Sequence, residues 1–527
     1  MKKVLLIAIS LFTFLTASAQ MDIRWGERFY DILDDCKAAE IVAEDNNAFY
    51  LWYCLEEYIG QGESKLQYYF ARTDKSGNVE KVVKIDFPHQ SFKIEQTWRA
   101  GDCVGFILSR INEDKPVQKK GSKKTVSKTK TGTAHLYTQY FHLRDMRLMD
   151  KPQKINVFKY FAQEGEKPYL FNFSENKTKM VFCFFENDTT KGRSANIRVY
   201  DQRMNVLWEK THRLNINNDA YQMCDVAVNN TGSEVLLAIR SYSTAKKVKH
   251  TDDKAHLVWL TQYEERTYEQ QPEKAWPTDI KCAFNMEDDY LMAGYYGTTN
   301  DKPTLATGSF AYLYDNRRGY LKQSSTAEFR DYENDEMVAE GLPKPSDMTA
   351  GIRALVPMIG GNLIMVGEQK FISHIIPPKR RGDKPTGEEA VYFRDIIITN
   401  IDKHGMVSGN AYIPKRQKDV EGFEAYNSFA MTRDRYGIYI MFNDHIKNYD
   451  GNAFEAKKCY NADKLRTQVN FVQIFSDGSY RWSKAYDTKK NKMPFFQTLY
   501  LTTLKQIMFL GRYQDHNIIG TFELRSH

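Results

Sequence analysis

Residues 169–210 contain the stretch that decides the fold. The segment 169–173 (YLFNF) leads through a polar turn, 174–178 (SENKT), into the apolar run 179–185 (KMVFCFF). A third run, 195–201 (ANIRVYD), ends in Asp and is followed after a short turn by 206–210 (VLWEK). Short aromatic and β-branched runs separated by Asn, Asp and Gly turns are typical of β-strands. This stretch therefore predicts four consecutive antiparallel strands.

The same four-strand unit recurs along the chain. Equivalents of the apolar second strand begin near residues 48, 104, 180, 234, 290, 362, 438 and 507. A repeat of more than ~50 residues with four strands fits a propeller blade that carries loop insertions. Helical periodicity is scarce. We predict an all-β fold, a single β-propeller of eight four-stranded blades; seven blades or two stacked β domains are the alternatives.

The two ends of the chain fit one blade. The last unit supplies only three strands, the third at residues 517–524, whereas the segment 22–30 precedes the first complete unit. An open blade would leave an exposed sheet edge, which proteins normally avoid. We therefore predict that residues 22–30 pair with the C-terminal strand, with Ile23, Trp25 or Phe29 buried in the eighth blade.

The repeat lengthens where insertions interrupt it. We place these insertions at about 112–133, 329–345, 377–390 and 450–466. Residues 115–133 include seven Lys and no acidic residue, which predicts a solvated basic loop. Its central lysines are Lys119, Lys120, Lys123 and Lys124. Residues 329–340 mix apolar and acidic side chains and are interpreted as a short helix between blades.

The N-terminus has the pattern of an export signal. Lys2 and Lys3 precede an apolar run at 4–17, and Ala17-Ser18-Ala19 forms a cleavage site before Gln20. We expect a mature propeller at residues 20–527, exported to the periplasm, with the outer surface or the extracellular space as alternatives. No later stretch offers the ~18 apolar residues of a spanning helix. We expect no transmembrane anchor, and a monomer.

Composition excludes some classes of protein. The chain has 74 Lys and Arg against 67 Asp and Glu, and this small surplus argues against a nucleic-acid partner. Its seven Cys form no C-x-x-C pair. Cys54, Cys183, Cys224 and Cys282 lie in apolar strand-like runs, where Cys behaves as a small buried hydrophobe. We expect most thiols to be free, with one or two disulfides as the alternative.

Two local resemblances accompany this pattern. The pieces at 173–182 and 228–238 resemble the repeat of TolB-type, WD40-like propellers, although the Pro of that family's turn is absent. The phrases at 294–297 (GYYG), 367–369 (GEQ) and 395–402 (DIIITNID) are similar to those of uncharacterised exported Bacteroidota proteins. The resemblance implies a propeller and an exported compartment, and it implies no activity.

Motifs for known chemistry are missing from the sequence. There is no G-x-S-x-G nucleophile elbow, no H-E-x-x-H zinc motif and no pair of His at metal-ligand spacing. We therefore predict no catalytic residue, no metal and no cofactor.

Seven polar residues follow strands of the predicted sixth and seventh blades. They are Glu368, Gln369, Lys415, Arg416, Gln417, Asn443 and Asp444. Strand ends of neighbouring blades converge on one face of a propeller, so these residues are the candidate binding site. The alternative is that they cap turns and pair with each other at the rim.

The resulting hypothesis is a non-enzymatic propeller that serves as a platform for a protein or glycan of the cell envelope. The alternative is a carbohydrate-active enzyme, either a hydrolase or a lyase. A hydrolase would need two carboxylates ~5 to 9.5 Å apart on one face. The candidates for this pair are Glu368 with either Asp444 or Glu421.

Overall fold

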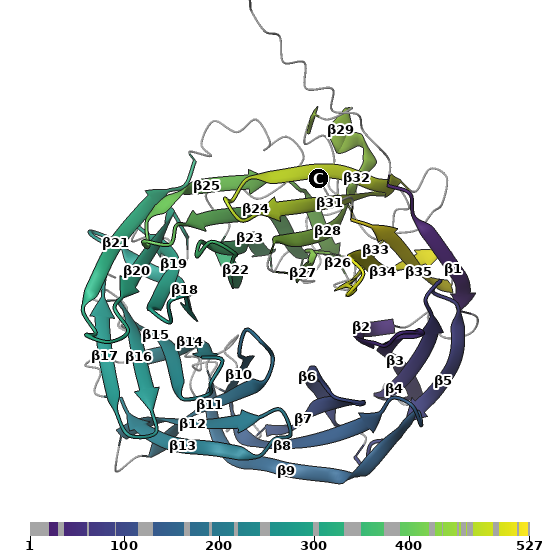
Figure 1. The fold of residues 1–527 in the computed structure, drawn as a ribbon, viewed down its shortest axis with the longest axis horizontal. Helices are drawn as coiled ribbons and strands as arrows, with labels where there is room; N and C mark the ends of the chain where they lie inside the picture. The colour runs from purple at the N-terminus through teal and green to yellow at the C-terminus, as the bar shows by residue number, and fades with distance from the viewer. Residues whose placement is uncertain are drawn as a thin grey trace, which may run out of the picture.

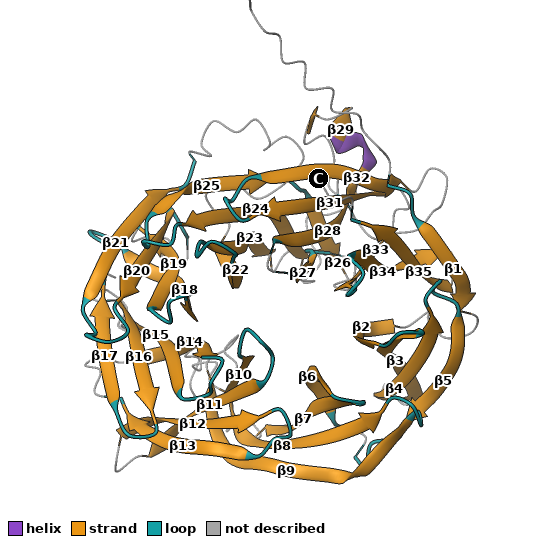
Figure 2. Ribbon diagram, viewed as in Figure 1, coloured by secondary structure: helices purple, strands orange, loops and turns teal. Residues whose placement is uncertain are grey.

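The chain forms a ring of eight sheets, each with four antiparallel strands (Figure 1). The computed structural model describes residues 21–29, 36–60, 63–89, 91–113, 130–162, 169–188, 192–214, 220–242, 253–298, 305–330, 349–373, 390–420, 427–434, 436–450, 453–454, 460, 467–487, 495–513 and 516–524. Strands make up nearly all of the regular structure in these residues (Figure 2). The prediction of one eight-bladed β-propeller is confirmed.

Each blade runs from an inner first strand to an outer fourth strand (Figure 1). In order from blade 1 to blade 8, the first strands are β2 (Cys36–Glu44), β6 (Lys93–Ala100), β10 (Tyr169–Phe173), β14 (Ala220–Val228), β18 (Trp276–Phe284), β22 (Thr349–Pro357), β27 (Ala430–Arg433) and β33 (Phe495–Leu501). The second strands are β3 (Ala48–Gly60), β7 (Cys103–Glu113), β11 (Lys179–Asp188), β15 (Glu234–Tyr242), β19 (Tyr290–Gly297), β23 (Leu363–Ser373), β28 (Gly437–His445) and β34 (Gln506–Tyr513).

The outer half of each blade follows in the same order. The third strands are β4 (Glu63–Asp74), β8 (Lys130–His142), β12 (Gly192–Asp201), β16 (Lys254–Thr261), β20 (Gly308–Tyr314), β24 (Ala390–Ile401), β31 (Thr467–Phe475) and β35 (His516–Glu523). The fourth strands are β5 (Val79–Ile85), β9 (Arg147–Ala162), β13 (Val206–Arg213), β17 (Glu265–Gln270), β21 (Leu321–Glu328), β25 (Val407–Ile413), β32 (Tyr480–Asp487) and β1 (Arg24–Phe29). Outside this plan lie β26 (Gln417–Val420), the 3-10 helix η5 (Ile446–Asn448), β29 (Tyr449–Asp450) and β30 (Ala453–Phe454).

The central residues of the second strands are apolar because the blades stack face to face. Successive side chains of a strand point to opposite faces. In β3, Tyr50 and Trp52 face blade 2, whereas Phe49 and Leu51 face blade 8. Every residue of β19 and of β28 is buried. A strand covered on both faces has no reason to alternate polar and apolar residues, which explains the continuous runs in the sequence.

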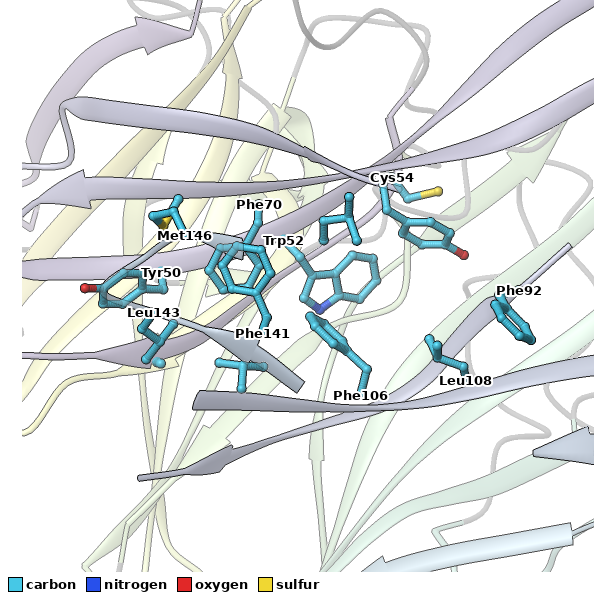
Figure 3. Close-up of a cluster of buried hydrophobic side chains, with 14 of the residues drawn as sticks. Tyr50, Trp52, Cys54, Phe70, Phe92, Phe106, Leu108, Phe141, Leu143 and Met146 are labelled. Carbon is cyan, nitrogen blue, oxygen red and sulfur yellow. The ribbon is translucent and has the colours of Figure 1, made fainter. Parts of the chain in front are cut away.

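The hydrophobic core is divided into eight clusters, one for each junction between neighbouring blades. Figure 3 shows the cluster between blades 1 and 2. Phe70 of β4 and Phe141 of β8 stack there with ring centroids 4.1 Å apart. Aromatic pairs of this kind add to the stabilisation that comes from burying their area. Each blade is thus stabilised on both sides by its neighbours.

The ends of the chain close the ring, as predicted. Strand β1 pairs with β35 in antiparallel fashion, with Trp25 opposite Gly520. The indole of Trp25 makes edge-on contacts with Tyr486 (5.3 Å) and Phe509 (5.5 Å) in the cluster between blades 7 and 8. Ile23 packs against the same cluster. The eighth blade therefore combines one N-terminal strand with three C-terminal strands.

Hydrogen bonds near the axis join neighbouring blades. These bonds link first strands: Glu40 with the Thr97 hydroxyl (2.8 Å), Asn172 with the Val226 carbonyl (2.8 Å), Asp279 with the Ile352 amide (2.7 Å) and Thr498 with the Ala39 carbonyl (2.7 Å). The register of β18 shifts between Pro277 and Asp279. A β-bulge of this kind re-aims a side chain, here toward the next blade.

The two faces of the ring differ in their connections. Turns from first to second strands and from third to fourth strands lie on one face, which we call the turn face. The shortest of these turns is 101–102 and the longest is 315–320. Connections from second to third strands and between blades begin and end at the opposite face, the insertion face. Its longer connections are 114–129, 243–253, 298–307, 329–348, 374–389, 414–429 and 446–466. All the long connections of the propeller thus belong to one face.

Asp at the end of a third strand shapes the turn face. Oδ1 of Asp402 accepts hydrogen bonds from the backbone N–H groups of His404 and Met406, both at 2.9 Å. Asp74 and Asp201 bind their own turns in the same way. An Asx turn offers the backbone these bonds locally, which favours a tight connection.

The predicted insertions are shorter in the structure where strands extend into them. Residues 112–113 belong to β7, and residues 130–133 belong to β8, so Lys130 is part of a strand. Lys119, Lys120, Lys123 and Lys124 lie outside the described residues, as does most of the segment interpreted as a helix at 329–340. The insertion at 450–466 includes β30, and β29 begins just before it, at Tyr449.

Candidate functional site

The candidate residues meet between blades 6 and 7 at the insertion face. Glu368 and Gln369 are in β23, Lys415 and Arg416 follow β25, and Asn443 and Asp444 are near the end of β28. We call the following set the polar cluster: Glu368, Gln369, Asp395, Lys415, Arg416, Gln417, Ser428, Asn443, Asp444, Asn448 and Tyr449. Apart from Tyr449, whose hydroxyl bonds to Asp444, these residues are buried. Residues of two blades thus come together here and bond mostly to one another. Their role as a binding site stays a prediction.

A local irregularity of the sheet creates space for these side chains. The register of β23 and β24 shifts between Glu368 and Lys370, and Asp395 lies in the shifted part of β24. Strand β25 pairs with the later half of β24, and β26 then pairs with its earlier half, Phe393 opposite Gln417. Lys415 and Arg416 lie where the chain crosses from one pairing to the other, so their side chains enter the blade interior.

Glu368 is neutralised within the cluster. Its Oε1 forms an ion pair with Nζ of Lys415, and its Oε2 accepts a hydrogen bond from the Ser428 hydroxyl at 2.6 Å. Burial lowers the pKa of Lys415, although the negative charge of Glu368 opposes this shift. The side chains of Lys415 and Glu368 are 0% and 6% exposed. A buried charge of this kind is tolerated only when it is paired.

Asp395 is the second anion of the cluster and pairs with two arginines. Its Oδ1 accepts a hydrogen bond from Nη1 of Arg416 at 2.5 Å, and its Oδ2 pairs with Arg330. Burial alone would raise the pKa of Asp395, but the charges of Arg416, Arg394 and Arg330 outweigh burial, and the pKa is lowered. Asp395 was not among the site residues predicted from the sequence. A charged Arg394-Asp395 pair inside an otherwise apolar strand was the signal that could have revealed it.

Gln417 joins the cluster to both blades. Its Oε1 accepts hydrogen bonds from Nζ of Lys415 (2.9 Å) and the N–H of Ser428 (2.6 Å). Its Nε2 donates to the carbonyls of Ser428 (3.1 Å) and Asn443 (2.6 Å). Asn443 in turn exchanges two hydrogen bonds with the backbone of Phe495 in blade 8, at 2.6 and 2.8 Å. A fully satisfied buried amide of this kind fixes a unique arrangement of the strands around it.

Asp444 receives four hydrogen bonds. The donors are the His445 N–H (2.6 Å), Asn448 Nδ2 (2.9 Å), the Arg416 N–H (3.2 Å) and the Tyr449 hydroxyl (2.9 Å). Burial is the largest influence and raises the pKa of Asp444 to about 7, despite these donors. Through Asn448 and Tyr449 the carboxyl group holds η5 and β29, the start of the connection at 446–466.

Together the polar cluster anchors three connections of the insertion face. Asp395 pairs with Arg330, which lies in 329–348. Residues 415–417 and Ser428 lie in 414–429, and Asn448 lies in 446–466. Gln369 is buried beside Glu368, but no described residue bonds to its Oε1. Glu421 lies outside the described residues.

A Ser–His–Glu trio in blade 4 was also missed by sequence reasoning. Oγ of Ser241 is 2.8 Å from Nε2 of His256, and Nδ1 of His256 is 3.8 Å from Oε2 of Glu269. This is the order of groups in a serine hydrolase. However, Ser241 is 0% exposed, and burial lowers the pKa of His256 to about 4. The second distance also exceeds that of a hydrogen bond. We assign the trio a structural role that joins three strands.

The described residues offer no metal site and no membrane-spanning helix. They contain no group of three or more His, Cys, Asp or Glu arranged to hold a metal ion. No helix in the described ranges has the length and hydropathy to cross a bilayer. Cys54, Cys103, Cys183, Cys224 and Cys282 are free thiols, and Cys54, Cys183 and Cys282 are buried. Cys459 lies outside the described residues.

Comparison with known proteins leaves the family open. No protein-family profile and no curated protein matches the chain, so the local resemblances to TolB-type repeats and exported Bacteroidota proteins gain no support. Among solved structures, similarity extends to an unknown function protein from Dyadobacter fermentans DSM 18053 (8% identity, 84% of this chain, 97% of that chain, TM-score 0.30).

Two enzymes are also similar at low identity. They are xylan beta-1,4-xylosidase from Bacillus halodurans C-125 (9% identity, 94% of this chain, 96% of that chain, TM-score 0.25) and the phage phi92 endosialidase (9% identity, 92% of this chain, 73% of that chain, TM-score 0.30). At these identities and TM-scores we draw no function from any of the three structures.

Proposed function

We propose that this protein is an exported, non-enzymatic propeller that holds a protein or glycan of the cell envelope on its insertion face. The observation that carries the proposal is the polar cluster, which anchors three long connections of that face to the rigid ring. Loops positioned by a rigid scaffold are the usual carriers of recognition. A scaffold fixed in advance also lowers the entropic cost of binding.

The chemistry of the cluster supports a holding role. The carboxylates of Glu368 and Asp395 are paired with Lys415, Arg416 and Arg330, and Asp444 accepts hydrogen bonds from four donors. A glycoside hydrolase needs two carboxyl groups that flank the substrate. Glu368 and Asp444 are 5% and 0% exposed, so neither reaches a glycan in this arrangement.

Site-specific photo-crosslinking tests which face binds. A photoreactive residue is placed at Asn112, Thr298 or Ile372, at strand ends of the insertion face. The matched controls carry it at Tyr263, Met286 or Leu504, which are 85%, 67% and 72% exposed on the turn face. In cells, we expect discrete adducts from the first set and none from the second.

Adducts from the turn-face positions alone, or equally from both sets, would overturn the proposal. Export is tested separately by sequencing the N-terminus of the mature protein, which should begin at Gln20. Recovery of Met1 from cytoplasmic protein would contradict the exported location.

A further inference from the structure

One ion pair joins blades that are not neighbours. The guanidinium of Arg433 in β27 donates two hydrogen bonds to Glu175, at 2.9 Å to Oε1 and 2.6 Å to Oε2. Glu175 belongs to the turn between β10 and β11 in blade 3, whereas Arg433 belongs to blade 7. In a ring of eight, these two blades are directly opposite. The interblade bonds described above all join neighbours, so this pair spans the axis of the ring at its turn face.

The geometry of the turn explains how it reaches so far. Figure 1 shows the turn after β10 extending from blade 3 toward the centre of the ring. The turn is stiffened internally, because Oδ1 of Asn176 accepts hydrogen bonds from the Ser174 hydroxyl (2.8 Å) and the Thr178 N–H (3.1 Å). The backbone N–H of Asn176 donates a hydrogen bond to Oδ1 of Asn230 in blade 4, at 3.0 Å. Glu175 therefore projects from a fixed support.

The support on the opposite side is equally well defined. Arg433 ends β27, and the next residue, Asp434, caps the following turn by accepting from the N–H groups of Tyr436 (2.8 Å) and Gly437 (2.9 Å). Asp434 also pairs with Lys505 of blade 8. A two-bond contact between guanidinium and carboxylate has a fixed geometry, unlike a single contact with Lys.

We propose that the Glu175–Arg433 pair is a brace across the ring, which holds blades 3 and 7 at a fixed separation and crosses the axis at the turn face. A partner that approaches the inner strands along the axis from the turn face would meet this pair. That consequence rests on the proposed function. The brace itself does not, because its test needs no partner.

Hydrogen exchange in Glu175→Ala, Arg433→Ala and the double variant tests the brace. Backbone opening near the two supports should become easier, so exchange should accelerate in β10 and β27. Blades 1 and 5 are also opposite each other, at right angles to the line that joins blades 3 and 7. Their first strands, β2 and β18, are the internal controls. Their exchange should be unchanged. Each single variant should reproduce the double variant, because either one removes the whole contact.

Unchanged exchange in β10 and β27, or additive effects of the two single variants, would refute the brace. A second measurement covers variants that fold poorly. A short bis-maleimide should link Glu175→Cys to Arg433→Cys and should fail to link Glu175→Cys to Met286→Cys in blade 5. Equal cross-linking of both pairs, or none at 175 and 433, would also overturn the proposal.

Discussion

Trp25 offers the sharpest test of ring closure. The substitution Trp25→Ala keeps β1 in the chain but removes the side chain that attaches it to the cluster between blades 7 and 8. Truncating a fully buried Trp costs about 3–5 kcal/mol. Trp25 is half-buried, which lowers this value, but it makes two edge-on aromatic contacts of about 0.5–1.5 kcal/mol each. We expect a loss of about 2–4 kcal/mol in the free energy of unfolding.

Arg24→Ala is the matched control on the same strand. The ion pair of Arg24 with Glu523 has side chains that are 71% and 64% exposed. Exposed pairs contribute about 0–1 kcal/mol, so this variant should unfold close to the wild-type urea concentration. Urea denaturation followed by far-UV circular dichroism measures both variants. If Trp25→Ala and Arg24→Ala unfold at the same urea concentration as the wild type, β1 is not integral to the ring and the reasoning fails.

Three further predictions concern the polar cluster and the Lys-rich segment. Lys415→Met leaves the buried Glu368 carboxylate without its cation and should lower the free energy of unfolding by about 3–5 kcal/mol. The double variant Lys415→Met/Glu368→Gln should recover much of this loss. Equal urea midpoints for the single and the double variant would contradict the buried pair. The pKa of Asp444 is raised from 3.8 to about 7, so the free energy of unfolding should fall as pH rises from about 4 to about 7 and then stay level. This slope should be weaker in Asp444→Asn, and equal slopes in the two proteins would argue against the shift. Deleting residues 116–128 should change the melting temperature by less than ~5 °C in a thermal scan, since a solvated loop buries little, and a larger drop would show that it packs.

The number of blades could be predicted because the second strands are buried on both faces. Runs such as Tyr290–Gly297 leave no alternation, and each occurs once per blade. The convergence of Glu368, Lys415 and Asp444 could also be predicted, since strand order alone brings the ends of β23, β25 and β28 to one face. Strand β26 was missed because QKDV is short, polar and lacks any β-strand pattern.

The pairing inside the site depends on distant contacts that no local pattern specifies. Arg330 reaches Asp395 across 65 residues, and Arg433 reaches Glu175 across 258. Each such pair depends on where the ring places two blades, and this is fixed only when all eight have assembled. Ser428, with its left-handed φ of 64°, likewise carries no sequence signal for its role beside Glu368 and Gln417.

The closure of blade 8 also matters for handling this protein. Arg24 lies opposite Thr521, and the N–H of Leu524 donates to the carbonyl of Lys505 in the turn before β34. Both described ends of the chain therefore leave from the turn face. A purification tag or display fusion joined at residue 21 or 524 would leave from the turn face, opposite the insertion face. The described ends are also near enough for circular permutation. With a linker from 524 to 21 and new ends at the turn 262–264, blade 4 instead of blade 8 would be built from both ends of the chain.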